Sequence, residues 1–359
     1  MTQTRSNQFV SFVVDNLIWI FVIIAFLAFS LLSERFFTPV NIGNILIRIA
    51  ALGMLVLSQT YTFITGNFDL SVESTLGFTA MFAGLLLVAD TAGGLGLMLP
   101  TPVVIGLMLV VGALIGLFNG TMITRLRVNN LIVTIAMLFI LRGATYGISP
   151  GTSISLPREF TWLGSEALFR LAWPGARANL VIPVAGVFVI LAFLVAYIHT
   201  RYTQFGRNMY AIGSDAEAAR TAGIRVERTI TIVYIIAGVC AAFAGVIVAG
   251  RLSAATPTLG YGQIFSVHAA TIIGGVSFYG GRGNVLGAFG GVLLWSILDT
   301  GLLTMQVSPF WIEVSRGLLL LFAIFIDALR VRYQRQMAMR VALADTTVGL
   351  EDRKFSYGS

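Results

Sequence analysis

The stretch VVIGLMLVVGALIGLFNGTMI, residues 103–123, contains no charged side chain. A helix needs about 20 consecutive apolar residues to cross a bilayer. Because the hydrocarbon core of a membrane holds no water, the backbone groups of such a stretch must bond to one another, and a helix does this within one segment. Residues 103–123 therefore predict a membrane-spanning helix, and the rest of the chain repeats this pattern.

The composition extends this reading to the whole chain of 359 residues, of which 57% are hydrophobic and 11% are charged. Soluble domains carry about 25% charged residues, so the sequence predicts an all-α polytopic membrane protein. One cysteine and two histidines favour neither a disulfide scaffold nor a metal site. We expect ten transmembrane helices, at residues 12–32, 45–64, 71–90, 103–123, 131–148, 179–198, 229–249, 264–279, 284–305 and 310–329, with 264–279 the shortest.

The basic residues predict the orientation of these helices. With the N-terminus inside, 15 of the 23 basic residues lie in inside segments and 5 in outside segments, as expected for cytoplasmic loops. The chain is therefore predicted to be N-in and C-in. An odd number of helices in each half would give two inverted five-helix halves, a common arrangement in transporters. The predicted parts are a first half 1–148, an external connection 149–178, a second half 179–329 with an internal loop 199–228, and a cytoplasmic tail 330–359.

The chain does not carry the motifs of common membrane-associated enzymes. Its single lysine, Lys354, is followed by Phe355, so the G-x-x-x-x-G-K-[ST] loop of ATP hydrolysis cannot form. The internal His268 is expected to bond between helices, as polar side chains in membranes do. We therefore predict that this chain is not an enzyme and holds no catalytic residue, metal or cofactor.

The internal loop 199–228 contains signals for one short helix. Ser214 and Glu217 have the spacing of a capping box, and Gly223 stands where a helix commonly ends. These signals predict a helix over 215–222, kept thin by its four alanines. Such a helix could insert into a groove on another protein or lie on the membrane surface, and the residues alone favour neither.

The same loop resembles the cytoplasmic coupling loop of ribose-type monosaccharide ABC importer permeases. Further motifs of that family follow in the expected order, and together they cover roughly residues 40 to 330. The matching stretches are GNFDLSV at 66–72, FGR at 205–207, YAIG at 210–213, EAAR at 217–220, AGI at 222–224, IGGVS at 273–277, GGRG at 280–283 and VSPFW at 307–311.

The resemblance implies a permease of the bacterial inner membrane that moves a monosaccharide or polyol by alternating access. It implies a second permease copy or paralogue, a separate ATPase that binds ATP and Mg²⁺, and a periplasmic solute-binding protein, with no nucleic acid. The alternatives are a branched-chain amino acid or nucleoside permease, or an ion-coupled transporter. The residues predicted to couple to the ATPase are Gly206, Arg207, Glu217, Ala218, Ala219 and Gly223.

The turn between the second and third predicted helices carries Asp69, which could cap a helix, line a path for the solute, or do both. Here Asn67, Phe68 and Glu73 replace the family's Gly, Ile and Gly. This departure makes the family's sugar substrate less secure for this chain. The residues predicted to line the translocation path are Asn67, Asp69, Asn119, Arg142, Gly274, Gly275 and Ser277.

Charged groups inside the predicted helices require partners. Asp69 and Glu73 are four residues apart, where like charges repel, so Glu73 is protonated, faces water, or pairs with Arg48 or Arg142. Arg142 either faces the bundle or extends outward. Glu313 and Arg316 are expected to pair, whereas Asp299 has no predicted partner.

Polar and small residues inside the predicted helices give two packing expectations. Asn119 is expected to bond to a neighbouring helix rather than to the solute. Two glycine stripes predict close helix contacts, and they comprise Gly112, Gly116 and Gly120, and Gly283, Gly287 and Gly291.

Overall fold

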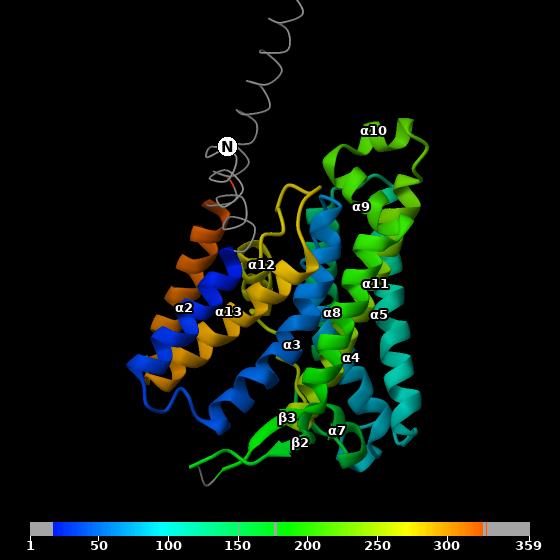
Figure 1. The fold of residues 1–359 in the computed structure, drawn as a ribbon. Coiled ribbons are helices and arrows are strands. Elements are labelled where there is room, and N and C mark those ends of the chain that lie inside the picture. The colour runs from blue at the N-terminus through cyan, green and yellow to red at the C-terminus, as the bar shows by residue number, and fades with distance from the viewer. Residues whose placement is uncertain (1–16, 150, 176–177, 326–327, 329–359) are drawn as a thin grey trace, which may run out of the picture.

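The computed structural model describes residues 17–149, 151–175, 178–325 and 328, and its helices form an elongated bundle (Figure 1). The short helices α9 (Gln204–Ser214) and α10 (Ala216–Thr221) lie at one end of the bundle (Figure 1). The hairpin of β2 (Ala167–Leu171) and β3 (Leu180–Pro183) lies with α7 (Arg158–Ser165) at the other end (Figure 1). The predicted tail 330–359 and the first residues of the predicted helix 12–32 lie outside the described part of the chain.

Six described helices are long and apolar enough to cross a membrane. They are α3 (Pro39–Ile64), α5 (Thr101–Thr124), α6 (Asn130–Ile148), α8 (Val184–Tyr202), α11 (Val226–Leu252) and α13 (Val285–Thr304). Three apolar helices are shorter, namely α2 (Leu17–Leu32), α4 (Val72–Leu87) and α12 (Gln263–Ile273). Residues 309–325 are also helical. The helical, polytopic class is therefore confirmed.

Several predicted boundaries were wrong. The helix predicted at 45–64 already begins at Pro39. The helix predicted at 179–198 begins only at Val184, because Leu180–Pro183 form strand β3. The segment 264–279 is not a full helix, because α12 ends at Ile273 and glycine-rich irregular chain follows. With eleven residues, α12 is about half the length that a bilayer requires.

Polar side chains fix where several long helices begin. The hydroxyl of Thr38 accepts from the backbone N–H of Asn41, and Pro39 occupies the first turn of α3. The side chain of Asn129 likewise caps α6, and that of Asn284 caps α13. These caps bond backbone N–H groups that have no partner inside the helix.

Helix α11 lies at the centre of the bundle and packs against α5, α3, α4 and α7. Its contact with α5 runs along the first glycine stripe. A Cβ at Gly116 would overlap the carbonyl oxygen of Tyr234, and a Cβ at Gly112 would overlap that of Gly238. The predicted close packing is confirmed, and it occurs within one chain. The second stripe also packs closely, because Gly287 and Gly291 of α13 face the backbone of α12.

The segment 149–178 folds at the end of the bundle opposite α10. Strand β1 (Ile154–Ser155) pairs antiparallel with β4 (Ala254–Ala255). Helix α7 (Arg158–Ser165) then packs against α11, and β2 (Ala167–Leu171) pairs with β3. This segment is therefore tied to the bundle by backbone hydrogen bonds.

Candidate functional site

Helices α3 and α4 are separated by an irregular turn, residues 65–71, which we call the central break. Gly66 has φ +72°, a left-handed conformation that suits glycine. Asn67 and Asp69 are both buried in this turn. The amide of Asn67 donates to the carbonyl oxygen of Thr65 and accepts from Asn130 at the start of α6. The break therefore joins the ends of three helices through polar side chains.

Asp69 forms a hydrogen-bonded chain with two neighbours. One carboxylate oxygen accepts from the backbone N–H of Ser71 at 2.9 Å and from its hydroxyl at 2.6 Å. The Ser71 hydroxyl in turn accepts from the amide of Asn119 on α5 at 3.0 Å. Asn119 thus bonds to a neighbouring segment as predicted, while its buried amide oxygen has no hydrogen-bond partner among the described residues. Asp69 orders the turn just before α4.

Glu73 pairs with Arg142, one of the alternatives that the sequence left open. The two groups are 3.2 Å apart and both side chains are almost fully buried. The other Glu73 oxygen accepts from the backbone N–H of Ile264 in the first turn of α12, at 2.9 Å. Arg142 also donates to the carbonyl oxygen of Leu259 at 3.0 Å, and its guanidinium lies over the ring of Tyr261. Arg142 therefore faces the bundle.

The chain before α12, residues 253–262, runs irregularly along α4. A Cβ at Gly77 would crowd the carbonyl oxygen of Leu259, and Gly260 lies against the backbone of Glu73. Residues 253–273 are therefore helical only in their second half, α12, and their first half contains strand β4. Partly helical segments bring backbone N–H and C=O groups to membrane depth, where transporters bind solutes and ions. In this chain the carboxylate of Glu73 accepts from one such group, the backbone N–H of Ile264 in the first turn of α12.

The chain after α12, residues 274–284, returns to the central break. The rings of Phe278 and Phe68 are 4.4 Å apart. Of the predicted path residues on this loop, Gly274 packs against Gly287 of α13. Ser277 accepts from the backbone N–H of Tyr279. The structure thus brings this loop to the break, with Gly274 in contact with α13 and Ser277 bonded within the loop.

Three glycines bring the internal loop into direct contact with the central break. Gly280 lies against the backbone of Gly66 and the carbonyl oxygen of Gly213, so that a Cβ at Gly280 would have no room. The backbone N–H of Gly281 donates to the carbonyl oxygen of Ile64, the last residue of α3, at 2.9 Å. We call Gly66, Gly213 and Gly280 the glycine junction. It joins the end of α3, the end of α9 and the loop after α12.

Helix α9 (Gln204–Ser214) carries one side of this junction and was not predicted. Its start is capped by Thr203, whose hydroxyl accepts from the backbone N–H of Gly206. Met209 and Ile212 are buried on its inner face. The hydroxyl of Tyr210 donates to the carbonyl oxygen of Gly283 at 2.9 Å, and burial raises the pKa of Tyr210. The signal that could have predicted α9 is the cap at Thr203, followed by apolar residues three positions apart, Met209 and Ile212.

The short helix predicted at 215–222 is α10 (Ala216–Thr221). Its cap is Asp215, which accepts from the N–H groups of Glu217 and Ala218, so the assignment to Ser214 was wrong. Ser214 ends α9, and its hydroxyl donates to the carbonyl oxygen of Tyr210. The predicted glycine stop is confirmed, because Gly223 has φ +82°.

The predicted coupling residues differ in exposure. Arg207, Glu217, Ala218 and Gly223 are exposed, whereas Gly206 and Ala219 are buried within the chain. Glu217 is the most prominent, with 80% of its side chain exposed. Arg220 bonds to both Glu227 and Glu217, and these carboxylates raise the pKa of its guanidinium. An exposed rim with both signs of charge therefore surrounds α10.

A second buried charge cluster was only partly predicted. Asp299 of α13 pairs with Arg48 of α3 and with Arg316, each at 2.6 Å. Arg316 also pairs with Glu313 as predicted. Sequence spacing found the local pair, but it gave Asp299 no partner because both partners are distant along the chain. His268 bonds to the carbonyl oxygen of Ile264 in its own helix, so the expected bond between helices was wrong.

Comparisons with known proteins agree with these features. The family model described as the permease component of the branched-chain amino acid transport system matches residues 41–325. The ribose import permease protein RbsC of Bacillus subtilis is 34% identical over 83% of this chain and 88% of its own length. The L-arabinose ABC transporter permease protein AraH of Azospirillum brasilense is 32% identical, over 90% of each chain.

A third relative, the galactose/methyl galactoside import permease protein MglC of Haemophilus influenzae, is 30% identical over 92% of this chain and 98% of its own length. No solved structure matches the chain. The family match covers the long helices, the central break, α9 and α10 together. The chain therefore belongs to the family of transport-system permease components described for branched-chain amino acids, which includes sugar import permeases.

Proposed function

We propose that this chain is the membrane-spanning permease of an ATP-driven importer for a monosaccharide or polyol. The support is the similarity to permeases named for ribose, L-arabinose and galactose, each over most of both chains. ATP hydrolysis belongs to a partner ATPase, since this chain has no phosphate-binding loop. A solute-binding protein would deliver the substrate on the opposite side of the inner membrane.

The proposed topology has ten membrane segments with both termini in the cytoplasm. It counts α12 with the irregular segment 253–262 as one segment, and it counts the helix at 309–325 as the last. Basic residues support the orientation, because they concentrate at the end of the bundle that carries α9 and α10. Two inverted halves are consistent with five segments on either side of 149–178.

The structural observation that supports coupling between a partner ATPase and the solute path is the glycine junction. Helices α9 and α10 are exposed at one end of the bundle, and Gly213 at the end of α9 touches the central break through backbone atoms. Backbone contacts without intervening side chains transmit a displacement with little loss, because packed interiors deform poorly. A partner that moves α10 would therefore move the ends of α3 and α4.

The central break is the part of the proposed path that such a movement would change. It contains Asn67 and Asp69 and bonds to Asn119. These side chains offer the hydrogen-bonding groups that match hydroxyl groups of a sugar. Weak, wet contacts of this kind would allow release into the cytoplasm, while the solute-binding protein would provide most of the selectivity.

Substitution of Glu217 by Arg tests the coupling role. Glu217 is exposed at the tip of α10, so reversal of its charge should abolish transport and leave membrane insertion intact. The matched control is Glu34→Arg, which makes the same change at an exposed site between α2 and α3. Normal uptake by Glu217→Arg, or equal loss in the control, would contradict the assignment.

Uptake into proteoliposomes tests the function itself. The vesicles would contain this chain, its ATPase and its binding protein, and pentoses, hexoses, polyols, nucleosides and leucine would be offered. We expect ATP-dependent uptake of one sugar or polyol that is lost without the binding protein. Uptake of leucine or a nucleoside would support the other branches of the family, and uptake driven by a proton gradient without ATP would overturn the proposal.

A further inference from the structure

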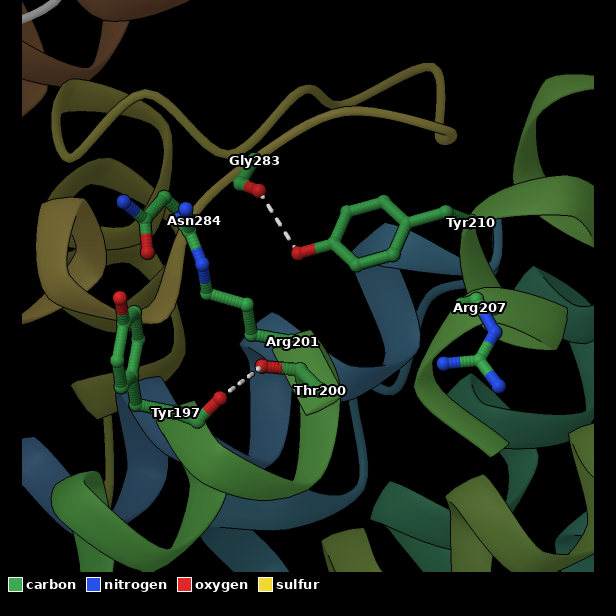
Figure 2. Close-up of a pocket in the computed structure, with 7 residues that line it drawn as sticks. All are labelled: Tyr197, Thr200, Arg201, Arg207, Tyr210, Gly283 and Asn284. Carbon is green, nitrogen blue, oxygen red and sulfur yellow. Dashed lines mark hydrogen bonds between the residues drawn. The ribbon is translucent and has the colours of Figure 1, made fainter. Parts of the chain in front are cut away.

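A cavity of about 300 Å³ lies between α8, α9 and the start of α13, near the end of the bundle that carries α10. Its lining includes Tyr197, Arg201, Arg207, Tyr210 and Asn284 (Figure 2). This volume is at the lower end of the range for small-ligand sites. The solute path proposed above does not use this cavity, since it involves Asn67 and Asp69, which are not among the lining residues.

The lining presents hydrogen-bond donors and positive charge without a compensating acid. Arg201 lies over the ring of Tyr197, and Arg207 donates to the side chain of Gln204. In the described part of the chain, neither arginine forms an ion pair. No Asp or Glu is among the lining residues. Arg201 and Arg207 both line the cavity, so an anion in it would find guanidinium N–H donors that no carboxylate of the described residues neutralises.

The remaining polar groups at the cavity suit the same kind of ligand. The amide oxygen of Asn284 is used, because it caps α13, which leaves its NH₂ group as a donor. The hydroxyl of Tyr210 is bonded to Gly283 and lies between Arg201 and Arg207 in the view of Figure 2. Guanidinium groups recognise phosphate with paired N–H donors. A phosphate group matches this set better than a neutral solute.

The position of the cavity suggests where such a phosphate comes from. Helix α8 exposes an apolar face that includes Leu191, Leu194 and Ile198, and this face ends at the turn that carries Arg201. A surface of this kind faces lipid tails, and basic pockets at its cytoplasmic end bind anionic headgroups. Tyr197 and Tyr202 lie at the same end of α8, as aromatic residues do at membrane interfaces.

We propose that the cavity between α8, α9 and α13 binds a phosphate group of an anionic ligand, through Arg201 and Arg207. An anionic phospholipid of the cytoplasmic leaflet supplies this phosphate at the height of the cavity. A bound headgroup there would contact both α8 and α9, and α9 carries Gly213 of the glycine junction. The inference rests on the proposed membrane orientation, but its test requires no transport.

Native mass spectrometry of the purified full chain tests the site. The probes are phosphatidylglycerol, phosphatidylcholine and inorganic phosphate. We expect preferential retention of phosphatidylglycerol, and we expect Arg201→Gln and Arg207→Gln each to lower its affinity about fivefold, equivalent to about 1 kcal/mol for one arginine at an anionic surface. Arg201→Lys keeps the charge but loses the paired N–H donors, so it should bind more tightly than Arg201→Gln and less tightly than the unchanged chain, which separates loss of the site from loss of the fold.

The matched control is Arg225→Gln, because Arg225 is an exposed arginine of the same internal loop outside the cavity. Displacement of the lipid by inorganic phosphate would indicate a soluble phosphate compound as the ligand, and resistance to phosphate would indicate the lipid; both outcomes support the site. Equal retention of phosphatidylcholine, or an equal loss of binding in Arg225→Gln, would overturn it. The assay reads binding only, so its failure is distinct from a failure of transport.

Discussion

The contact of α5 with α11 and the contact of α4 with α12 are both buried, but different chemistry holds them together. The first is made by glycines that let two helix backbones touch, as Gly116 does against Tyr234. The second depends on the buried carboxylate of Glu73 in α4, which accepts from the backbone N–H of Ile264 in α12 and pairs with Arg142 of α6. The first contact has one well-packed arrangement, whereas the second uses polar groups that can exchange partners.

This difference suggests which parts of the permease stay rigid during transport. A close backbone contact between uninterrupted helices resists sliding, because any shift creates overlap or a void. A partly helical segment held by side-chain hydrogen bonds can move and bond again to water or solute. We therefore expect α5 and α11 to form the fixed frame. We expect α12 and the central break to be the moving part.

The largest effect on stability is expected from removal of one partner of the buried ion pair. Arg142→Gln removes the charged partner of the buried Glu73 carboxylate, which keeps its bond to the backbone N–H of Ile264. Loss of one partner of a buried pair costs about 3–5 kcal/mol in soluble proteins. We expect a large fall in the melting temperature of the permease in nanodiscs.

The double variant Glu73→Gln with Arg142→Gln provides the control for this prediction. It removes both charges, so it should be more stable than Arg142→Gln alone and give a clear coupling energy in a double-mutant cycle. Additive effects of the two substitutions would show that Glu73 of α4 and Arg142 of α6 are not coupled, and the ion pair could then no longer be counted among the interactions that hold this region together.

A smaller effect is expected from an added methyl group in the α5–α11 contact. The Cβ of Gly116→Ala would overlap the Tyr234 carbonyl oxygen, and overpacking of this kind costs about 1–3 kcal/mol. Gly106→Ala is the matched control on the same helix, because a Cβ there meets no atom within 4 Å. Thermal unfolding of both variants measures the difference. Equal stability would mean that the close contact is not a rigid frame.

Hydropathy predicted most of the long helices because each apolar stretch determines its own structure. It failed at the end of α12, because the prediction continued the helix to residue 279, whereas the chain after Ile273 is irregular. What keeps the loop at 274–284 irregular is contact with the central break, at Gly280 for example. Such contacts join residues that are far apart in the chain, and spacing carries no information about them.

In the candidate site, too, the features set by local sequence could be predicted, whereas the contacts between distant residues could not. Local patterns identified α10 and its stop at Gly223, while the motif match identified the central break. The partners of Asn119 and Asp299 could not be predicted, because each is fixed by packing between distant helices. Asp215 and Ser214 are both good caps by type, and the choice depended on α9, which was itself not predicted.

The smallest effect on stability is expected at this cap, where the comparison extends to the coupling loop. Asp215→Ala removes the acceptor for two backbone N–H groups of α10, and loss of such a cap costs about 0.5–2 kcal/mol of helix stability. We expect faster hydrogen exchange in residues 216–221 and reduced transport, with the melting temperature of the bundle unchanged. Ser214→Ala is the control, because its hydroxyl bonds to α9 rather than to α10.

If Asp215→Ala lowered the stability of the α5–α11 frame, the coupling loop would belong to the rigid part. A larger loss of transport in Ser214→Ala than in Asp215→Ala would show instead that the end of α9, and not α10, carries the movement to the glycine junction.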